Sequence, residues 1–168
     1  PSTWKTGTPA DDESYAWSSD ITALTGQVLT VLTGSSRESS FTGEQENWKI
    51  GRGFYNTSVM KATSAAKDAV LLYAGTDASL GQWFVPSMNE LNELCKYARG
   101  QSTGVLTEAC SGSYNLKSGI LNDLGGFEGL FYWSSSELDV SNVMYQAFTN
   151  IALQVNASKT AQLNVRPI

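Results

Sequence analysis

The side chains that could carry catalytic or metal chemistry are sparse in this sequence. The 168-residue chain has no histidine, which removes the commonest general base and the commonest zinc ligand. Ser134 to Ser136 are potential nucleophiles, but no base accompanies them, and we interpret them as backbone-bonding turn residues. The acidic run Asp11 to Glu13 is more typical of a solvated loop than of a metal site. We therefore expect no catalytic residue, no metal, no cofactor and no enzymatic activity.

Two cysteines, Cys95 and Cys110, flank a polar loop and leave two interpretations open. They do not form a C-x-x-C redox motif, and two cysteines alone cannot build a structural zinc site. A disulfide between them would close a loop and contribute about 3 kcal/mol to stability. Two buried, reduced thiols fit the sequence equally well, because the redox compartment is not given by the residues.

Composition and charge narrow the class of partner. The net charge is −5 and the eleven Lys and Arg residues are scattered, whereas nucleic-acid binders carry a basic stripe. No run of 18 apolar residues is present that would span a bilayer. We expect the partner to be a protein or another cell-surface molecule, and we expect neither nucleic-acid binding nor membrane insertion. Whether the chain forms an oligomer is left open.

The amount of apolar sequence suits one domain. Hydrophobic residues make up 41% of the chain and include five Trp, enough for a single core. We expect residues 1–168 to form one domain, with weaker support over residues 1–50. Pro1 is an unusual first residue, so we interpret the sequence as a fragment of a longer protein.

Two segments have helical periodicity. Apolar residues at 3.6-residue spacing predict a helix over Thr57–Tyr73, capped by Asn56 or Thr57 and followed by Gly75. A second helix is predicted after Ser87, where Ser87 and Glu90 have the spacing of a capping box, and it should end at Gly100.

Short strand candidates occupy both ends of the chain. Alternating apolar residues between turn signals predict an α+β domain with two helices, short antiparallel strands and long loops. Asn156 to Thr160 is polar and suits a hairpin loop. The expected strands are Ser14–Trp17, Val28–Leu32, Asn47–Ile50, Phe131–Trp133, Val143–Phe148, Ile151–Val155 and Leu163–Ile168.

Three motifs stand in order along the chain. Residues 81–94 read G-Q-W-F-V-P-S-M-N-E-L-N-E-L, residues 132–137 read Y-W-S-S-S-E, and residues 165–168 read V-R-P-I. In this order they resemble the bacterial and phage C-type-lectin-fold domains related to formylglycine-generating enzyme. Their spacing is most similar to the variable proteins of diversity-generating retroelements. The resemblance covers about Gly51 to Ile168 and implies a C-type-lectin-like fold whose ligand-binding residues are altered by adenine-directed mutagenesis.

The last third of the chain has a pattern that is independent of the motifs. In Val143–Phe148 the side chains alternate between two faces, and Met144 and Phe148 form a natural core pair. The odd-numbered residues would then point outward and continue through Ile151, Leu153 and Val155, which makes an apolar surface typical of an interaction site. Two alternatives stay open: the odd set could itself be the core, or a turn near residues 149–150 could reverse the alternation.

The alternation and the resemblance together predict a binding face between about Glu137 and Asn164. The function implied is a variable ligand-binding protein, such as a phage or viral receptor-binding tail component or a cell-surface adhesin, located on a virion tail or cell surface. The residues expected to contact the ligand are Leu138, Asp139, Asn142, Tyr145, Ala147, Thr149, Ile151, Leu153, Val155, Ala161 and Leu163.

Two other functions compete with this hypothesis. The chain could be an invariant structural or adhesin module of a bacterial or phage surface protein, which would share all three motifs. It could also be an enzyme of the formylglycine-generating branch, which would require reactive chemistry at Cys95 or Cys110.

Overall fold

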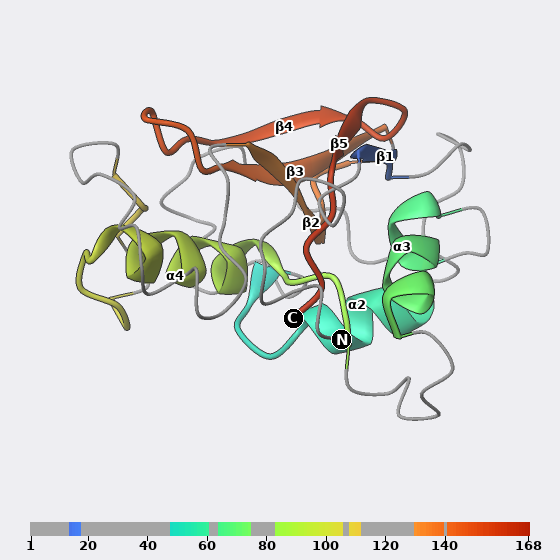
Figure 1. Cartoon of the computed structure of the whole chain (residues 1–168), viewed down its shortest axis with the longest axis horizontal. Coiled ribbons are helices and arrows are strands. Elements are labelled where there is room, and N and C mark those ends of the chain that lie inside the picture. The colour runs from blue at the N-terminus through green and yellow to red at the C-terminus, as the bar shows by residue number, and fades with distance from the viewer. Residues whose placement is uncertain are drawn as a thin grey trace.

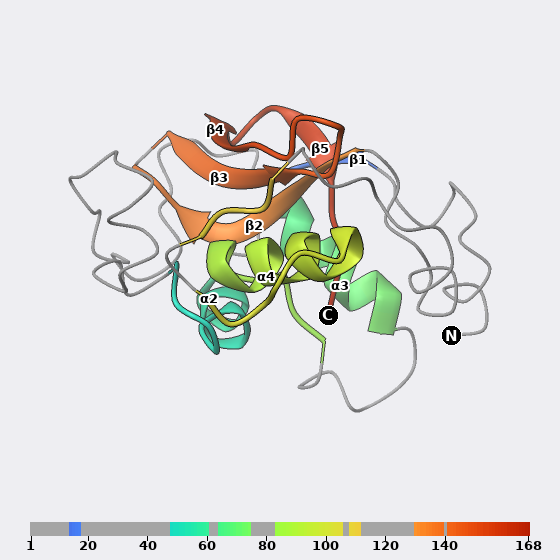
Figure 2. The same ribbon diagram turned by 90° about the vertical axis from the view of Figure 1, so that its left-hand side faces the viewer.

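The fold joins one curled sheet to a set of helices. The computed structural model describes residues 14–17, 48–60, 64–74, 83–105, 108–111, 130–139 and 141–168. In both views the strands lie on one side of the molecule and the helices on the other (Figure 1, Figure 2). This arrangement is α+β, as the sequence predicts. The elements in chain order are β1 (Ser14–Ala16), α2 (Gly53–Val59), α3 (Ala65–Ala74), α4 (Met88–Arg99), β2 (Phe131–Glu137), β3 (Asn142–Ala147), β4 (Gln154–Ser158) and β5 (Gln162–Asn164).

The five strands within the described ranges are ordered β1-β5-β2-β3-β4. Neighbouring strands are antiparallel except for β5 and β2, which run parallel with Tyr132 opposite Asn164, so the expectation of antiparallel strands is wrong at this pair. The register between β2 and β3 shifts between Trp133 and Glu137. Because of this irregularity β2 can continue through the three serines, which the sequence placed in a turn.

Helix α4 follows the local sequence closely. The Ser87 hydroxyl accepts the Glu90 N–H at 3.4 Å, and the Glu90 carboxylate accepts the Ser87 N–H at 2.6 Å. This reciprocal pair is the capping box that the sequence predicts. Gly100 ends the helix in the left-handed region, with φ at 68°. Leu91 is buried, and Leu94 packs partly against the same core.

The single helix expected over Thr57–Tyr73 is wrong, because the chain forms two helices there. Helix α2 starts earlier, at Gly53, and ends at Val59, where Met60 turns to an extended ψ of 138°. The buried Ser64 hydroxyl accepts the Lys67 N–H at 3.2 Å and so caps a new helix, α3. The Lys67 ammonium donates to the Met60 carbonyl at 2.7 Å and satisfies the end of α2. Gly75 lies outside the described residues.

The strand boundaries also differ from the expectations. Residues 48–51 form a turn, so the strand expected at Asn47–Ile50 is wrong where it is described. Strand β4 begins at Gln154, three residues later than expected, and runs to Ser158 through the region predicted as a loop. Strand β5 stops at Asn164. The Val28–Leu32 strand and the acidic run at residues 11–13 lie outside the described residues.

Two hydrophobic clusters stabilise the sheet. The first joins Leu91 and Cys95 of α4 to Tyr132, Met144 and Phe148. The second has Trp133 and Val143 at its centre, with Trp17 and Val165 and residues of α3 around them. Successive residues of a strand point to opposite faces, so Tyr132 and Trp133 send one aromatic ring into each cluster. Of the helices in the described ranges, none has the length and apolar character needed to cross a bilayer.

The three sequence motifs meet in space. Phe84 and Ile168 exchange two backbone hydrogen bonds, of 3.1 and 3.0 Å, which join the first motif to the last. The Ser135 N–H donates to the Pro86 carbonyl at 2.8 Å, and the Ser136 hydroxyl accepts the Met88 N–H at 2.9 Å. The serines therefore bond to backbone, as expected, although from within a strand.

Candidate functional site

The alternation in β3 is partly as expected. Met144 is 7% exposed and Phe148 is fully buried, so the predicted core pair is confirmed. The outward direction of the odd residues is wrong for Val143 and Ala147, which are buried. Val143 is covered because the second cluster packs on that face. Tyr145 lies between these extremes and is half-buried.

The odd-numbered set continues from β3 into β4. Tyr145 pairs with Val155 and Val143 pairs with Ala157, so the turn between the strands preserves the alternation. The side chains of Leu153 and Ile151 are 41% and 53% exposed. Phe131 on β2 is opposite Ala147 and is 38% exposed. We call Phe131, Tyr145, Leu153 and Val155, with Ile151 at the turn, the hairpin face.

Aromatic contacts connect the hairpin face to the core. The rings of Phe131 and Tyr145 are 5.8 Å apart, and those of Tyr145 and Trp133 are 6.2 Å apart, both edge to face. Trp133 is fully buried, so the three rings run from the second cluster to the surface. Sequence reasoning missed Phe131. Strand periodicity places Phe131 on the same face as Trp133, but only the pairing of β2 with β3 brings it next to Tyr145.

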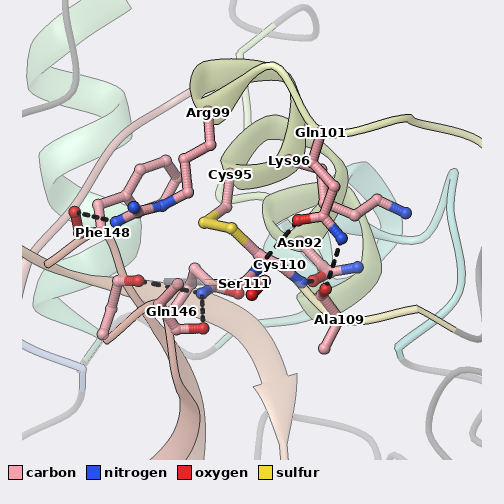
Figure 3. The surroundings of a disulfide bond; sticks show 12 residues. Asn92, Cys95, Lys96, Arg99, Gln101, Ala109, Cys110, Ser111, Gln146 and Phe148 are labelled. Atoms are coloured by element: carbon pink, nitrogen blue, oxygen red, sulfur yellow. Dashed lines mark hydrogen bonds between the residues drawn. A yellow bond between two sulfur atoms is a disulfide. The ribbon is translucent and has the colours of Figure 1, made fainter. Parts of the chain in front are cut away.

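Polar side chains of α4 and β3 fix the backbone of the turn that carries Ile151. The Arg99 guanidinium of α4 donates to the carbonyls of Phe148 and Thr149. The fully buried Gln146 amide donates to the carbonyls of Ala147, Ala152 and Leu153. Figure 3 shows the bond from Arg99 to the Phe148 carbonyl. Ala152 has a φ of 47°, and its buried methyl group belongs to the first cluster. These contacts set the backbone and leave the Ile151 side chain in solvent.

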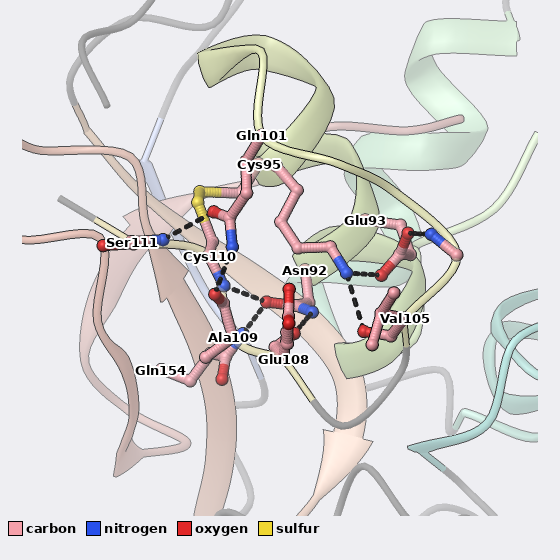
Figure 4. Close-up of polar contacts among 12 residues, drawn as sticks. Asn92, Glu93, Cys95, Gln101, Val105, Glu108, Ala109, Cys110, Ser111 and Gln154 are labelled. Atoms are coloured by element: carbon pink, nitrogen blue, oxygen red, sulfur yellow. Dashed lines mark hydrogen bonds and ion pairs between the residues drawn. A yellow bond between two sulfur atoms is a disulfide. The ribbon is translucent and has the colours of Figure 1, made fainter. Parts of the chain in front are cut away.

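A disulfide extends this support toward β4. Cys95 and Cys110 are bonded, which decides between the two interpretations of these cysteines. The Asn92 amide oxygen accepts the Cys110 N–H at 2.8 Å and also the Gln154 side-chain amide (Figure 4). Asn92 therefore links α4, the disulfide-bonded loop and the first residue of β4. The disulfide also leaves no free thiol at either position for chemistry.

The structure divides the residues that the sequence assigned to the ligand. Tyr145, Leu153 and Val155 lie together, with Ile151 and the half-buried Thr149 in the adjoining turn. Ala147 shares this face but is covered in this chain. Ala161 and Leu163 pack partly against the second cluster. Leu138, Asp139 and Asn142 are at the opposite end of β3, so they are not brought together with the hairpin face.

Asp139 and Asn142 are hydrogen-bonded to each other. The Asp139 carboxylate accepts the Ser141 and Asn142 N–H groups at 2.7 and 2.9 Å, and also the Asn142 side-chain amide. Burial alone would raise the pKa of Asp139, but these hydrogen bonds and the charge of Lys159 hold that pKa below its usual value. The pair shapes the β2–β3 turn.

Lys159 and Glu137 form a buried ion pair next to that turn. The Lys159 ammonium is 2.5 Å from a Glu137 carboxylate oxygen and lies over the Trp17 ring. Within the ranges that the structure describes, no three His, Cys, Asp or Glu side chains gather in a way that could hold a metal ion.

Comparisons with protein-family models, with curated proteins and with solved structures gave no match to this chain.

Proposed function

We propose that this chain is a ligand-binding domain that recognises a protein or another surface molecule through the hairpin face. The observation that carries the proposal is the contrast between exposed apolar side chains and the fixed backbone beneath them. Ile151 and Leu153 are in solvent, while Arg99, Gln146 and Asn92 bond the backbone and side chains of the same hairpin from below. A pre-organised surface loses little entropy on binding.

The chemistry of the face supports a neutral ligand surface. Residues 140–158 contain no Asp, Glu, Lys or Arg, although charged residues are 16% of the chain. Tyr145 and Phe131 supply large contact area with few rotatable bonds. A partner with exposed aliphatic or aromatic groups would gain more from this surface than a charged polymer would.

We further propose that the domain is a variable protein of a diversity-generating retroelement with a C-type-lectin-like fold, displayed on a virion tail or cell surface. The support is the resemblance of the three motifs and the way in which those motifs bond to one another. A scaffold of this kind must accept many side chains at its surface positions. The disulfide is consistent with an oxidising location outside the cytosol.

Sequencing the same locus from many isolates tests this proposal. We expect substitutions to concentrate at Tyr145, Thr149, Ile151, Leu153 and Val155. Position 147 should also vary, because it lies on the same face of β3 as Tyr145. Met144, Gln146 and Phe148 should stay constant, since they support the backbone. Substitutions spread evenly over the chain would contradict the retroelement assignment and favour an invariant structural or adhesin module.

A stability measurement tests the scaffold separately. Replacing Leu153 by Asn should change the unfolding free energy by less than about 1 kcal/mol, because Leu153 is 41% exposed and belongs to neither core cluster. The matched change Met144→Asn should cost about 3 kcal/mol or more, because it places an amide in the first cluster. Equal losses in chemical denaturation would show that the two positions do not differ as surface and core.

A further inference from the structure

Strand β4 is an edge of the sheet. Among the strands that the structure describes, β4 has a neighbour only on its β3 side, and it lies at the top of the molecule in both views (Figure 1, Figure 2). Its sequence, Q-V-N-A-S, contains no charge and no proline. Natural proteins usually protect exposed edges with such residues, because an open edge pairs readily with another strand.

The hydrogen bonds to β3 show which backbone groups point outward. The Leu153 carbonyl accepts the Ala147 N–H at 2.8 Å, and the Lys159 N–H donates to the Ser141 carbonyl at 2.9 Å. Odd-numbered residues of this strand therefore bond to β3. In an antiparallel pair, bonding alternates along the strand, so the N–H and C=O of Asn156 point away from β3. The Asn156 side chain is exposed as well.

Strand β4 is complementary to a second copy of itself. When two β4 strands run antiparallel about Asn156, the Asn156 residues exchange two hydrogen bonds across a two-fold axis. Ser158 of each copy then lies opposite Gln154 of the other, and Val155 lies opposite Ala157. The Ser158 carbonyl already accepts the Ala161 N–H at 2.9 Å, so Ser158 contributes its N–H to this pairing. No like charges meet anywhere along the strand, although each chain carries a net charge of −5.

We propose that two copies of this chain associate through β4 and form one continuous sheet. A two-fold axis perpendicular to the sheet keeps the same surface of both copies on one side. The two hairpin faces would therefore be adjacent and would face the same way. If the proposed function holds, the dimer is bivalent, and two weak contacts to one target surface reinforce each other.

The expected affinity is low because the contact is small. A strand of five residues buries less area than a standard stable interface. We expect a dissociation constant on the order of 100 µM. Sedimentation equilibrium at loading concentrations from about 10 µM to about 1 mM brackets that value. The average mass should rise from 18.1 kDa toward twice that mass.

Charge variants at the two-fold axis make the test specific. Asn156→Lys and Asn156→Asp each place two like charges opposite each other, which should weaken self-association by about tenfold. Mixing the two variants places opposite charges across the axis and should restore association. Asn150→Lys is the matched control, because it makes the same change at an exposed turn residue away from the β4 edge and should associate like the wild type.

Three results would overturn the dimer. The first two are a wild type that stays at 18.1 kDa throughout and an Asn156→Lys variant that associates as tightly as the wild type. The same applies if the mixture of oppositely charged variants fails to associate while the wild type does. These results leave the proposed function standing, since that depends on variation among isolates. Uniform variation among isolates would remove the proposed function and leave the dimer standing.

Discussion

Breaking the Cys95–Cys110 disulfide should lower the thermal unfolding midpoint of this chain by about 6 to 12 °C. The disulfide closes a loop with a sequence separation of 15, for which the chain-entropy treatment gives about 3 kcal/mol. A chain of this size loses roughly 2 to 4 °C for each kcal/mol. Both cysteines are buried in the first cluster, so their replacement also removes packing.

Four proteins distinguish the contribution of the cross-link to stability from the contribution of packing. The wild type, Cys95→Ala, Cys110→Ala and the double variant are compared by scanning calorimetry with and without a reducing agent. Either single change breaks the same bond, so each should cost nearly as much as the double change. Reducing agent should lower the midpoint of the wild type and leave the double variant, which is the matched control, unchanged.

Three results would refute this reasoning. The two thiols of the unfolded, unreduced wild type could react with a thiol reagent, which would mean that no disulfide is present. The single variants could have additive effects, which would mean that the loss comes from packing. The double variant could lose less than about 1 kcal/mol, which would mean that the loop from residue 100 to 110 is held by its other contacts. Contacts of that kind are present: the Asn92 amide oxygen accepts the Cys110 N–H at 2.8 Å, and the Gln101 amide donates to the Ala109 carbonyl at 2.9 Å.

Other substitutions address the hairpin support and the β2–β3 turn. Arg99→Met removes the donors to the Phe148 and Thr149 carbonyls, so the unfolding free energy measured in urea should fall by about 2 to 3 kcal/mol. A fall of less than about 0.5 kcal/mol would mean that these carbonyls find other donors. The unfolding free energy of Ala152→Gly should stay within about 1 kcal/mol of the wild-type value, because the relief of a positive φ offsets the loss of a buried methyl group. Ala152→Val should lower the unfolding free energy by about 2 kcal/mol or more, and equal effects of the two changes would argue against that backbone conformation. The hydrogen-bonded Asp139 has a lowered pKa in the folded chain, so its contribution to stability is present above the unfolded pKa of about 3.9 and is lost as the pH falls through the lower folded value. Unfolding measured against pH should therefore show the difference between wild type and Asp139→Asn shrinking below about pH 4, and a difference that grew toward acid would contradict the sign.

Local sequence determined those features whose causes lie within a few residues. The capping box at Ser87 and Glu90 and the glycine at position 100 define α4 by bonds within one turn of the helix, so its limits were predictable. The two-residue repeat of β3 likewise predicted that Met144 and Phe148 share the core, because strand geometry fixes which side chains lie on one face. The alternation also continued correctly into β4.

The tertiary structure decided what depends on distant neighbours. Val143 and Ala147 are both buried, Val143 because the second cluster covers its part of the face, and periodicity cannot reveal this. The break between α2 and α3 depends partly on the Ser64 hydroxyl, which donates to the Trp17 carbonyl 47 residues away. Phe131 joins the hairpin face only because β2 pairs with β3, and Cys95 meets Cys110 only because α4 and the following loop pack together. Local bonding thus defines an element such as α4, whereas burial is a property of the assembled chain, since it requires surfaces that are distant in sequence to exclude water together.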